Sequence, residues 1–279
     1  SDPSNPSTRV AEMKQMVKEL HKNDIRVIMD VVYNHVYNAA NHSFNKTVPG
    51  YYFRYDANGA LVNNSGCGND TASERKMMRK YIVDIVCRWI EVYDVDGFRF
   101  DLMGIHDVDT MNAVVAAGRQ LKPELMVYGE GWDLPTALND DLKACQRNNA
   151  KMPQVAHFND YFRDVVKGKT SDFDVQAKGY ATGNLFQAHD MPSALCANTL
   201  NKEMYKIYQQ PTQSINYVEC HDNATSWDKM KDCCKDEVRE IRVKRQKLMI
   251  AVTLVAQGVP FLQSGQEFCR TKYGYHNTY

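Results

Sequence analysis

The chain has 279 residues, of which 43% are hydrophobic and 24% charged, and its formal net charge at pH 7 is zero. That composition is typical of a globular protein with a large core. A net charge of zero gives no support for nucleic acid or an anionic membrane as a partner. No apolar run approaches the roughly 18 residues of a membrane span, so we expect neither nucleic-acid binding nor a membrane span.

The cysteines give information on metal binding and on the compartment. The eight cysteines include no C-x-x-C pair, which argues against a zinc ribbon or a redox motif. Cys87 falls in a helical pattern and Cys220 in a strand pattern, where a free cysteine behaves as a small apolar residue. This usage favours a reducing, cytoplasmic compartment of bacterial type over a secreted or cell-surface location, while the even count leaves disulfides open.

The first part of the chain alternates helical and strand patterns. An apolar stripe predicts a helix over residues 7–22, and a nearly continuous β-branched run predicts a buried strand over residues 25–33. The polar segment that follows predicts a short inserted loop subdomain at about residues 36–72. The sequence TASE at residues 71–74 has the pattern of a capping box and predicts the start of the next helix.

The alternation continues through the rest of the chain. Further strands are predicted at residues 96–102, 125–132, 154–160, 214–223 and 259–267, with helices at residues 108–121 and 238–257. Such alternation predicts right-handed βαβ units and a parallel sheet. Polar or charged side chains end each predicted strand, which favours an α/β, TIM-type (β/α)8 barrel. A doubly wound sheet is disfavoured because no glycine-rich phosphate turn is present.

The stretch GFRFDLMG, residues 97–104, places charge in an aromatic-rich strand. Because side chains alternate along a strand, Arg99 and Asp101 point to one face while Phe98 and Phe100 point to the other. Burying charge is costly unless the charge is paired or used. From this stretch alone, a structural ion pair and a functional carboxylate are both open.

Four motifs in order carry a family resemblance: DVVYNH (30–35), GFRFDLMG (97–104), YGEGW (128–132) and VECHDN (218–223). They resemble the signature regions of the α-amylase superfamily. Within it, the chain is similar over nearly its whole length to type I pullulanases, which are starch-debranching glycoside hydrolases. The segments VPGYYFRYD (48–56), GNDTASER (68–75) and RTKYGYHNTY (270–279) add to that similarity. The resemblance implies a retaining hydrolase that cleaves α-1,6 branch linkages in pullulan, amylopectin or glycogen-type α-glucans.

The resemblance implies three catalytic carboxylates. Asp101 matches the family's nucleophile, Glu130 its general acid/base, and Asp222 the third carboxylate that supports the oxocarbenium-like transition state. Retaining glycosidases need one ionised and one protonated carboxyl group about 5–5.5 Å apart. We expect Arg99 to favour the ionised form of Asp101 and apolar surroundings to favour the protonated form of Glu130. Without this context, the pair His221-Asp222 is typical of a helix cap.

The resemblance also implies contacts to the substrate. The predicted substrate-binding residues are His35, Asn69, Arg99, Met103, Trp132 and His221. For Trp132, stacking on a sugar face and a role in the core are both open. Asp30 and Asn34 are expected to orient their strand and the loop after it. No cofactor or metal is implied, and the residues do not indicate whether calcium binds.

The family's barrel has eight strands, and the chain carries the equivalents of the third to the eighth. We expect the first two strands, with the family's Y-x-W-G-Y motif, and additional domains to lie outside residues 1–279. These residues by themselves are therefore expected to form an incomplete barrel with little or no activity.

Three alternatives stay open at this point. The first is another member of the superfamily, such as an isoamylase, a branching enzyme or an α-1,4-acting amylase. The second is a barrel enzyme in which Asp101 and Glu130 bind Mg²⁺, which leaves Arg99 without a role. The third is a catalytically inactive carbohydrate-binding fragment.

Overall fold

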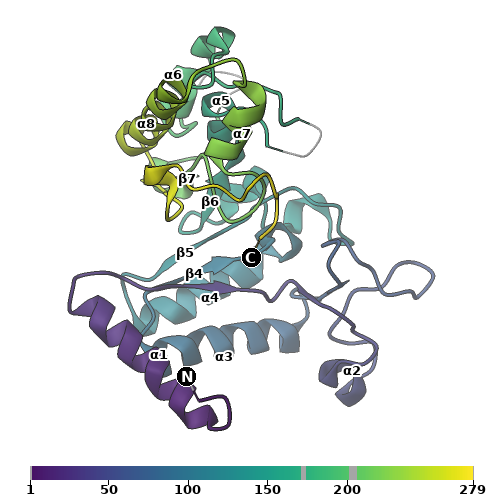
Figure 1. The fold of residues 1–279 in the computed structure, drawn as a ribbon. Helices are drawn as coiled ribbons and strands as arrows, with labels where there is room; N and C mark the ends of the chain where they lie inside the picture. Colours follow the sequence, from purple (N-terminus) through teal and green to yellow (C-terminus); the bar gives the residue numbers. More distant parts are fainter. Residues whose placement is uncertain (1, 171–173, 201–205, 279) are drawn as a thin grey trace. The chain divides into compact units, whose positions relative to one another are not determined.

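The computed structural model describes all residues except 1, 171–173, 201–205 and 279 (Figure 1). The chain divides into two compact units, Ser1–His157 and Phe158–Tyr279. Each unit is described here by itself. The parallel strands follow one another in the order β1-β4-β5-β6-β7-β8, which is the sequential order expected of βαβ units.

The first unit contains the parallel strands β1 (Ile28–Val31), β4 (Gly97–Phe100) and β5 (Met126–Gly129), and the start of β6 (Ala156–Asn159). Its main helices are α1 (Pro6–His21), α3 (Lys76–Tyr93) and α4 (Val108–Leu121). Helices α3 and α4 pack side by side (Figure 1). Every residue of β4 is buried, and α3 buries the stripe formed by Met78, Ile82, Val86 and Ile90. The predicted helices and strands of this unit are confirmed, with shorter strands than predicted.

A loop region lies between β1 and α3. It contains the short antiparallel pair β2 (His35–Val36) and β3 (Asn69–Asp70), together with helix α2 (Ser43–Thr47). Hydrogen bonds from Thr71 to the carbonyl groups of Tyr33 and Asn34 join its end to the residues that follow β1. The loop is therefore tied directly to the carboxyl end of β1.

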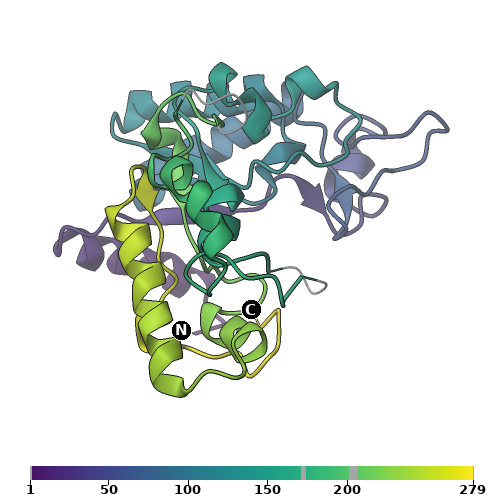
Figure 2. The same ribbon diagram turned by 90° about the horizontal axis from the view of Figure 1, so that it is seen from above.

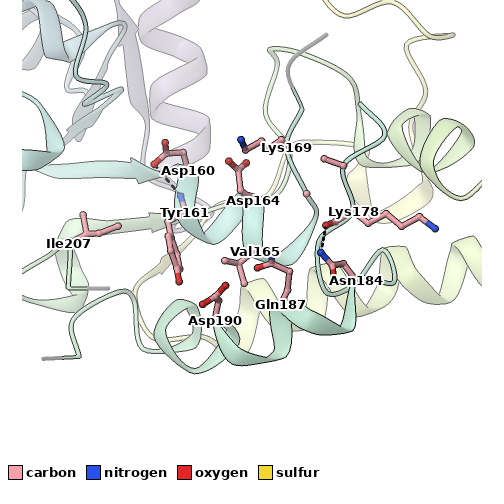
Figure 3. Close-up of a pocket in the computed structure, with 12 residues that line it drawn as sticks. Asp160, Tyr161, Asp164, Val165, Lys169, Lys178, Asn184, Gln187, Asp190 and Ile207 are labelled. Atoms are coloured by element: carbon pink, nitrogen blue, oxygen red, sulfur yellow. Dashed lines mark hydrogen bonds between the residues drawn. The ribbon is translucent and has the colours of Figure 1, made fainter. Parts of the chain in front are cut away.

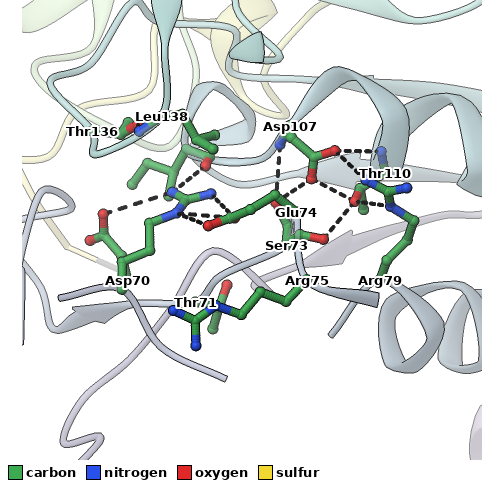
Figure 4. A network of polar contacts seen from close by, with 12 residues as sticks. Asp70, Thr71, Ser73, Glu74, Arg75, Arg79, Asp107, Thr110, Thr136 and Leu138 are labelled. Atoms are coloured by element: carbon green, nitrogen blue, oxygen red, sulfur yellow. Dashed lines mark hydrogen bonds and ion pairs between the residues drawn. The ribbon is translucent and has the colours of Figure 1, made fainter. Parts of the chain in front are cut away.

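The predicted capping box is wrong. No side chain caps the N-terminus of α3. Ser73 instead donates its hydroxyl proton to Asp107 at 2.7 Å, within a polar network that also includes Thr110 (Figure 4). The carboxylate of Glu74 accepts hydrogen bonds from the Nε and Nη2 atoms of the buried Arg54 guanidinium. In a capping box over residues 71–74, Thr71 and Glu74 would be the capping side chains. The Thr71 hydroxyl instead donates to the Tyr33 carbonyl at 2.6 Å, and Glu74 is the partner that buried Arg54 requires.

Because of Asp107, the stability of the first unit is expected to fall at acidic pH. Burial by itself would raise the pKa of Asp107. Hydrogen bonds from Thr110 and Ser73 and the charge of Arg79 outweigh burial and lower that pKa below its ordinary value. Such a carboxylate stabilises the fold above the unfolded-state pKa of about 3.9, and this stabilisation is lost as the pH falls through the lower folded-state pKa.

We therefore expect Asp107→Asn to lower the free energy of unfolding by about 2–3 kcal/mol at pH 7 and by clearly less at pH 3. Urea unfolding at both pH values measures the difference. Asp109→Asn is the matched control, since Asp109 faces the same Arg79 at 3.7 Å but its side chain is 74% exposed. Its effect is expected to stay below about 0.5 kcal/mol. Equal losses for Asp107→Asn at pH 7 and pH 3 would contradict the assignment.

In its described residues, the second unit contains the end of β6, the strands β7 (Ser214–Asn216) and β8 (Val259–Pro260), and four α-helices. The helices are α5 (Asp160–Val166), α6 (Met191–Leu195), α7 (Ser226–Cys233) and α8 (Arg239–Val255). Strands β7 and β8 are parallel. Helix α8 packs against α7, and Figure 2 shows its full length in yellow-green. Phe162, Met230 and Met249 are completely buried in the core of this unit.

Six short 3-10 helices complete the described elements: η1 (Met103–Ile105), η2 (Asp140–Leu142), η3 (Gln146–Lys151), η4 (Leu185–His189), η5 (Pro211–Gln213) and η6 (Gln266–Phe268). All eight cysteines lie in described parts of the chain and are free thiols. Within the described ranges, no helix is both long and apolar enough to cross a membrane.

Candidate active site

The carboxyl ends of β4 and β5 gather charged side chains around Arg99, which is 7% exposed. The Nη1 atom of Arg99 donates to Asp30 Oδ1 at 2.9 Å and to Asp101 Oδ1 at 3.1 Å. Its Nη2 atom lies 2.8 Å from Glu130 Oε1. The parallel register pairs Phe100 with Gly129, which places Glu130 beside the end of β4. One buried guanidinium therefore holds three carboxylates, and the predicted contact between Arg99 and Asp101 is present.

The charge of Arg99 is firmly maintained. Burial by itself would lower the pKa of Arg99. The charges of Glu130, Asp30 and Asp101 outweigh burial and raise that pKa above its ordinary value. A guanidinium that keeps its charge also supplies a constant counter-charge to the carboxylates around it.

Asp101 lies immediately after β4 and is held by Asn34 as well as by Arg99. The Nδ2 atom of buried Asn34 donates to Asp101 Oδ2 at 2.9 Å and to the Asp101 carbonyl at 2.6 Å. The next residue, Leu102, has a φ of 37°, in the left-handed region that non-glycine residues rarely adopt. In this turn the N–H group of Leu102 donates to Glu130 Oε2 at 2.9 Å. The chain after β4 thus positions both Asp101 and a donor for Glu130.

Glu130 is buried, as its setting in the sequence predicts, with 6% exposure. Its surroundings are not apolar, however, so this part of the prediction is wrong. Arg99 contacts one carboxyl oxygen and the N–H group of Leu102 contacts the other. Both partners come from β4 and the turn after it. They reach Glu130 through the parallel pairing of β4 with β5, which the local motif YGEGW does not indicate.

The glycines on either side of Glu130 allow close approaches. A Cβ atom at Gly129 would lie 2.4 Å from the Phe100 carbonyl oxygen. A Cβ atom at Gly131 would lie 2.2 Å from Nδ1 of the buried His157 ring. Neither distance is compatible with a side chain, so both glycines are required where β5 ends.

The predicted substrate-binding residues of the first unit differ in the exposure of their side chains and in the hydrogen bonds that these side chains already make. His35 is half-buried, and its Nδ1 atom lies 2.5 Å from Asn34 Oδ1. Trp132 is also half-buried, which leaves part of its surface available for a sugar. The side-chain Oδ1 atom of Asn69 accepts a hydrogen bond from the N–H group of Ala39 at 3.0 Å, so this side-chain amide holds the loop.

Met103 is predicted to bind substrate, and the structure buries its side chain. Its exposed fraction is 0%, and it packs in the core of the first unit. A Cβ atom at Gly129 would lie 2.9 Å from Met103 Cβ, so Met103 fills the space beside the end of β5. The local motif cannot separate this role from substrate contact, because Met103 directly follows the turn that carries Asp101.

His221 and Asp222 lie in the second unit, in the segment between β7 and α7. The Nε2 atom of His221 lies 3.5 Å from Asp222 Oδ1, and both side chains are partly exposed. Thr225 caps α7 by accepting the N–H group of Asp228. The helix-cap interpretation of Asp222 is therefore excluded, and its carboxylate is available for another role.

Arg54 is a structural residue that the sequence analysis missed. It is buried, and its Nη1 atom donates to the Ile105 carbonyl at 2.6 Å while Nη2 donates to Glu74 at 2.8 Å. These bonds connect the loop between β1 and α3 to η1, which directly follows Asp101 and Leu102. The signal that a search of the sequence could have used is the similarity of both FRYD and TASER to pullulanase segments.

A hollow of about 640 Å³ lies elsewhere in the second unit (Figure 3). Both acidic and basic side chains line it, among them Asp160, Asp164, Lys169 and Lys178, while His221 and Asp222 do not. Among the residues that the structure describes, no group of three or more His, Cys, Asp or Glu side chains is arranged to hold a metal ion. The candidate catalytic carboxylates are therefore those of the strand ends and not those of this hollow.

Two curated proteins similar to this chain are named pullulanases. The chain is 49% identical over all 279 residues to the pullulanase of Bacillus subtilis (strain 168), and covers 39% of it. It is 32% identical, over 98% of its length, to pullulanase 1, chloroplastic, of Arabidopsis thaliana, and covers 34% of that protein. The chain thus spans roughly a third to two fifths of the length of these relatives.

Solved structures show the same relationship. The crystal structure of pullulanase type I from Bacillus subtilis str. 168 complexed with maltose matches 99% of this chain with a TM-score of 0.97 and 49% identity, and the chain covers 39% of it. Apo pullulanase from Paenibacillus barengoltzii matches 99% of the chain with a TM-score of 0.96 and 42% identity, and the chain covers 42% of it. The fold is thus that of these enzymes, in agreement with the predicted TIM-type α/β class. The family described as "Alpha amylase, catalytic domain" matches residues 68–278, and this chain belongs to it.

Proposed function

We propose that the protein is a retaining glycoside hydrolase that cleaves α-1,6-glucosidic branch linkages in pullulan, amylopectin or glycogen-type α-glucans. The observation that carries this proposal is that Asp101 and Glu130, at the ends of adjacent strands, are held on the single buried guanidinium of Arg99. Similarity to pullulanases supports the linkage. Crystal structures of relatives with maltose and with maltotetraose support an α-glucan as ligand.

In the proposed reaction, Asp101 attacks the anomeric carbon and forms a glycosyl-enzyme intermediate. Glu130 donates a proton to the leaving oxygen and then removes a proton from the water that hydrolyses the intermediate. Arg99 and Asn34 hold the attacking carboxylate through one oxygen each, so that it is oriented before the substrate arrives.

The contacts of Glu130 bear on its proposed acid role. Arg99 and the N–H group of Leu102 occupy its two carboxyl oxygens. An acid must present its proton to the leaving oxygen. We infer that substrate binding exchanges one of these contacts, with the left-handed turn at Leu102 as the element that moves.

The family pattern supports the remaining roles. Asp222 would be the third carboxylate, which binds the hydroxyl groups of the reacting sugar and supports the transition state. His35 and His221 would hydrogen-bond the same sugar, and Trp132 would stack on a sugar face. This chemistry is carried by side chains alone, so no organic cofactor is required.

Product analysis tests the proposed linkage. Pullulan consists of maltotriose units joined by α-1,6 bonds, so the complete gene product is expected to release maltotriose as its only small product. Linear amylose, which has α-1,4 bonds alone, is the control substrate and is expected to stay intact. Release of mixed α-1,4/α-1,6 trisaccharides from pullulan, or cleavage of amylose, would instead indicate an α-1,4-acting member of the family. Absence of cleavage with retained oligosaccharide binding would indicate an inactive binding protein.

A further inference from the structure

Lys272 holds the backbone on both sides of Asp222. It is 5% exposed, and its Nζ atom donates to the carbonyl groups of His221, of Asn223 at 2.9 Å and of His276 at 2.8 Å. An ammonium group has three donors, and here three carbonyl groups accept them. Two of these carbonyl groups belong to the residues directly before and after Asp222.

The segment that carries Asp222 needs such support because it lies outside the sheet. Strand β7 ends at Asn216, so the later residues have no ladder partners in this sheet. Asn223 has a φ of 60°, a left-handed conformation that asparagine adopts only at single positions. Buried Glu219, which precedes Asp222 in the chain, accepts a hydrogen bond from the N–H group of Ser226, which follows it, at 2.8 Å. Side-chain contacts therefore fix this segment where strand pairing does not.

Asp228 fixes Lys272 in turn. This buried carboxylate on α7 accepts the backbone N–H group of Lys272 at 2.6 Å and the hydroxyl proton of Thr271 at 2.5 Å. It also accepts a hydrogen bond from Lys231 at 2.8 Å. Burial would raise the pKa of Asp228, but the hydrogen bonds from Lys231, Thr271 and Lys272 outweigh burial and lower it. The backbone of Lys272 is thus anchored to α7, and its side chain extends from there to the segment that carries Asp222.

We propose that Lys272 is a positioning residue that sets the orientation of Asp222 by clamping the carbonyl groups on either side of it. The proposal rests on the proposed function, in which Asp222 is the third carboxylate. Lys272 itself touches no substrate in this role. Its loss should therefore act through the segment of residues 221–223 that carries Asp222 and leave Asp101 and Glu130 intact.

Kinetics of the complete gene product test the proposal. Lys272→Met removes all three donors and keeps an apolar side chain of similar length. At a temperature where each variant is folded, it is expected to lower kcat/KM for pullulan about 100-fold, since misplacement by about 1 Å has that effect. Lys229→Met is the matched control, because Lys229 is buried in the same unit and donates to the carbonyl groups of Lys169 and Val175. This control is expected to lower Tm but to change kcat/KM less than about 3-fold.

A double-mutant cycle separates positioning of Asp222 from a general effect. In an Asp222→Asn background, Lys272→Met is expected to lower the remaining kcat/KM by less than about 5-fold, because the group it positions is already lost. The same loss in both backgrounds would overturn the proposal. If Lys272→Met does not fold, Lys272→Gln, which keeps an amide donor on a shorter side chain, replaces it in the cycle.

Hydrogen exchange gives a readout that does not depend on activity. Exchange in a peptide covering residues 219–226 is expected to be faster in Lys272→Met than in the wild type, and unchanged in Lys231→Met. Lys231 contacts the same Asp228 and Thr271 but none of the three clamped carbonyl groups. Unchanged exchange in Lys272→Met would overturn the clamp. If the wild type cleaves no α-glucan, the proposed function fails, and this measurement still decides whether the clamp exists.

Discussion

Replacing Asp101 by asparagine is expected to lower kcat for pullulan by about four orders of magnitude or more, with the fold retained. An amide of the same shape cannot form the glycosyl-enzyme intermediate. The fold is expected to persist because the site of substitution follows β4 and leaves the buried strand unchanged. Single-turnover kinetics together with thermal unfolding measure the two effects separately.

Asp30 provides the matched control for this prediction. Its carboxylate contacts the same Arg99 guanidinium at 2.9 Å, but its side chain is 53% exposed. Asp30→Asn therefore changes the charge balance around Arg99 without removing the proposed nucleophile, and a loss of no more than about tenfold is expected. Near-normal turnover in Asp101→Asn would show that Asp101 is not the nucleophile. Equal losses in the two variants would show that the charge of Arg99, rather than Asp101, controls the rate.

Replacing Glu130 by glutamine is expected to give a loss that depends on the leaving group. For pullulan, whose leaving oxygen needs a proton, kcat should fall by about three to four orders of magnitude. For α-maltotriosyl fluoride, whose fluoride leaves without a proton, the first chemical step should proceed at a rate close to that of the wild type. Comparing fluoride release with sugar release in rapid-mixing experiments measures the first step and the second step separately.

Glu74→Gln is the control for the loss of an ion pair. Glu74 pairs with buried Arg54 at 2.8 Å, as Glu130 pairs with buried Arg99 at 2.8 Å. Glu74→Gln should lower stability and affect both substrates equally, because Glu74 has no part in the proposed reaction. If Glu130→Gln also affects pullulan and the fluoride equally, Glu130 is not the acid.

The sequence allowed the order of helices and strands to be predicted because each element carries a clear apolar period. The stripe of α3 and the uninterrupted apolar character of β4 are two such signals. The predicted strands were too long. A strand ends where its neighbour stops pairing with it, and no pattern of residues indicates that point. The helix start at residues 71–74 was wrong for a related reason. Local pattern favoured a cap made by Thr71 and Glu74, whereas Thr71 bonds to the Tyr33 carbonyl and Glu74 to the distant Arg54.

In the candidate site too, local sequence patterns identified the residues but not the contacts between distant parts of the chain. Asp101, Glu130 and Arg99 could be identified because they stand at strand ends within recognisable motifs. The arrangement of Arg99 between three carboxylates could not, because it arises from the register of three parallel strands. Lys272 lies in the pullulanase-like segment 270–279, but its contacts could not be predicted either, since its partners are backbone carbonyl groups, which any residue carries. Contacts of that kind become visible only in the folded chain.

Identification of a covalent adduct tests the central claim that Asp101 and Glu130 perform a two-step, retaining reaction. Glu130→Gln is incubated with α-maltotriosyl fluoride, digested, and examined by mass spectrometry. The first step needs no acid and the second lacks its base, so a glycosylated enzyme should accumulate. We predict one maltotriosyl group on the peptide containing residues 97–104, attached to Asp101. An adduct on another carboxylate, or release of fluoride with no adduct at any time, would contradict the claim.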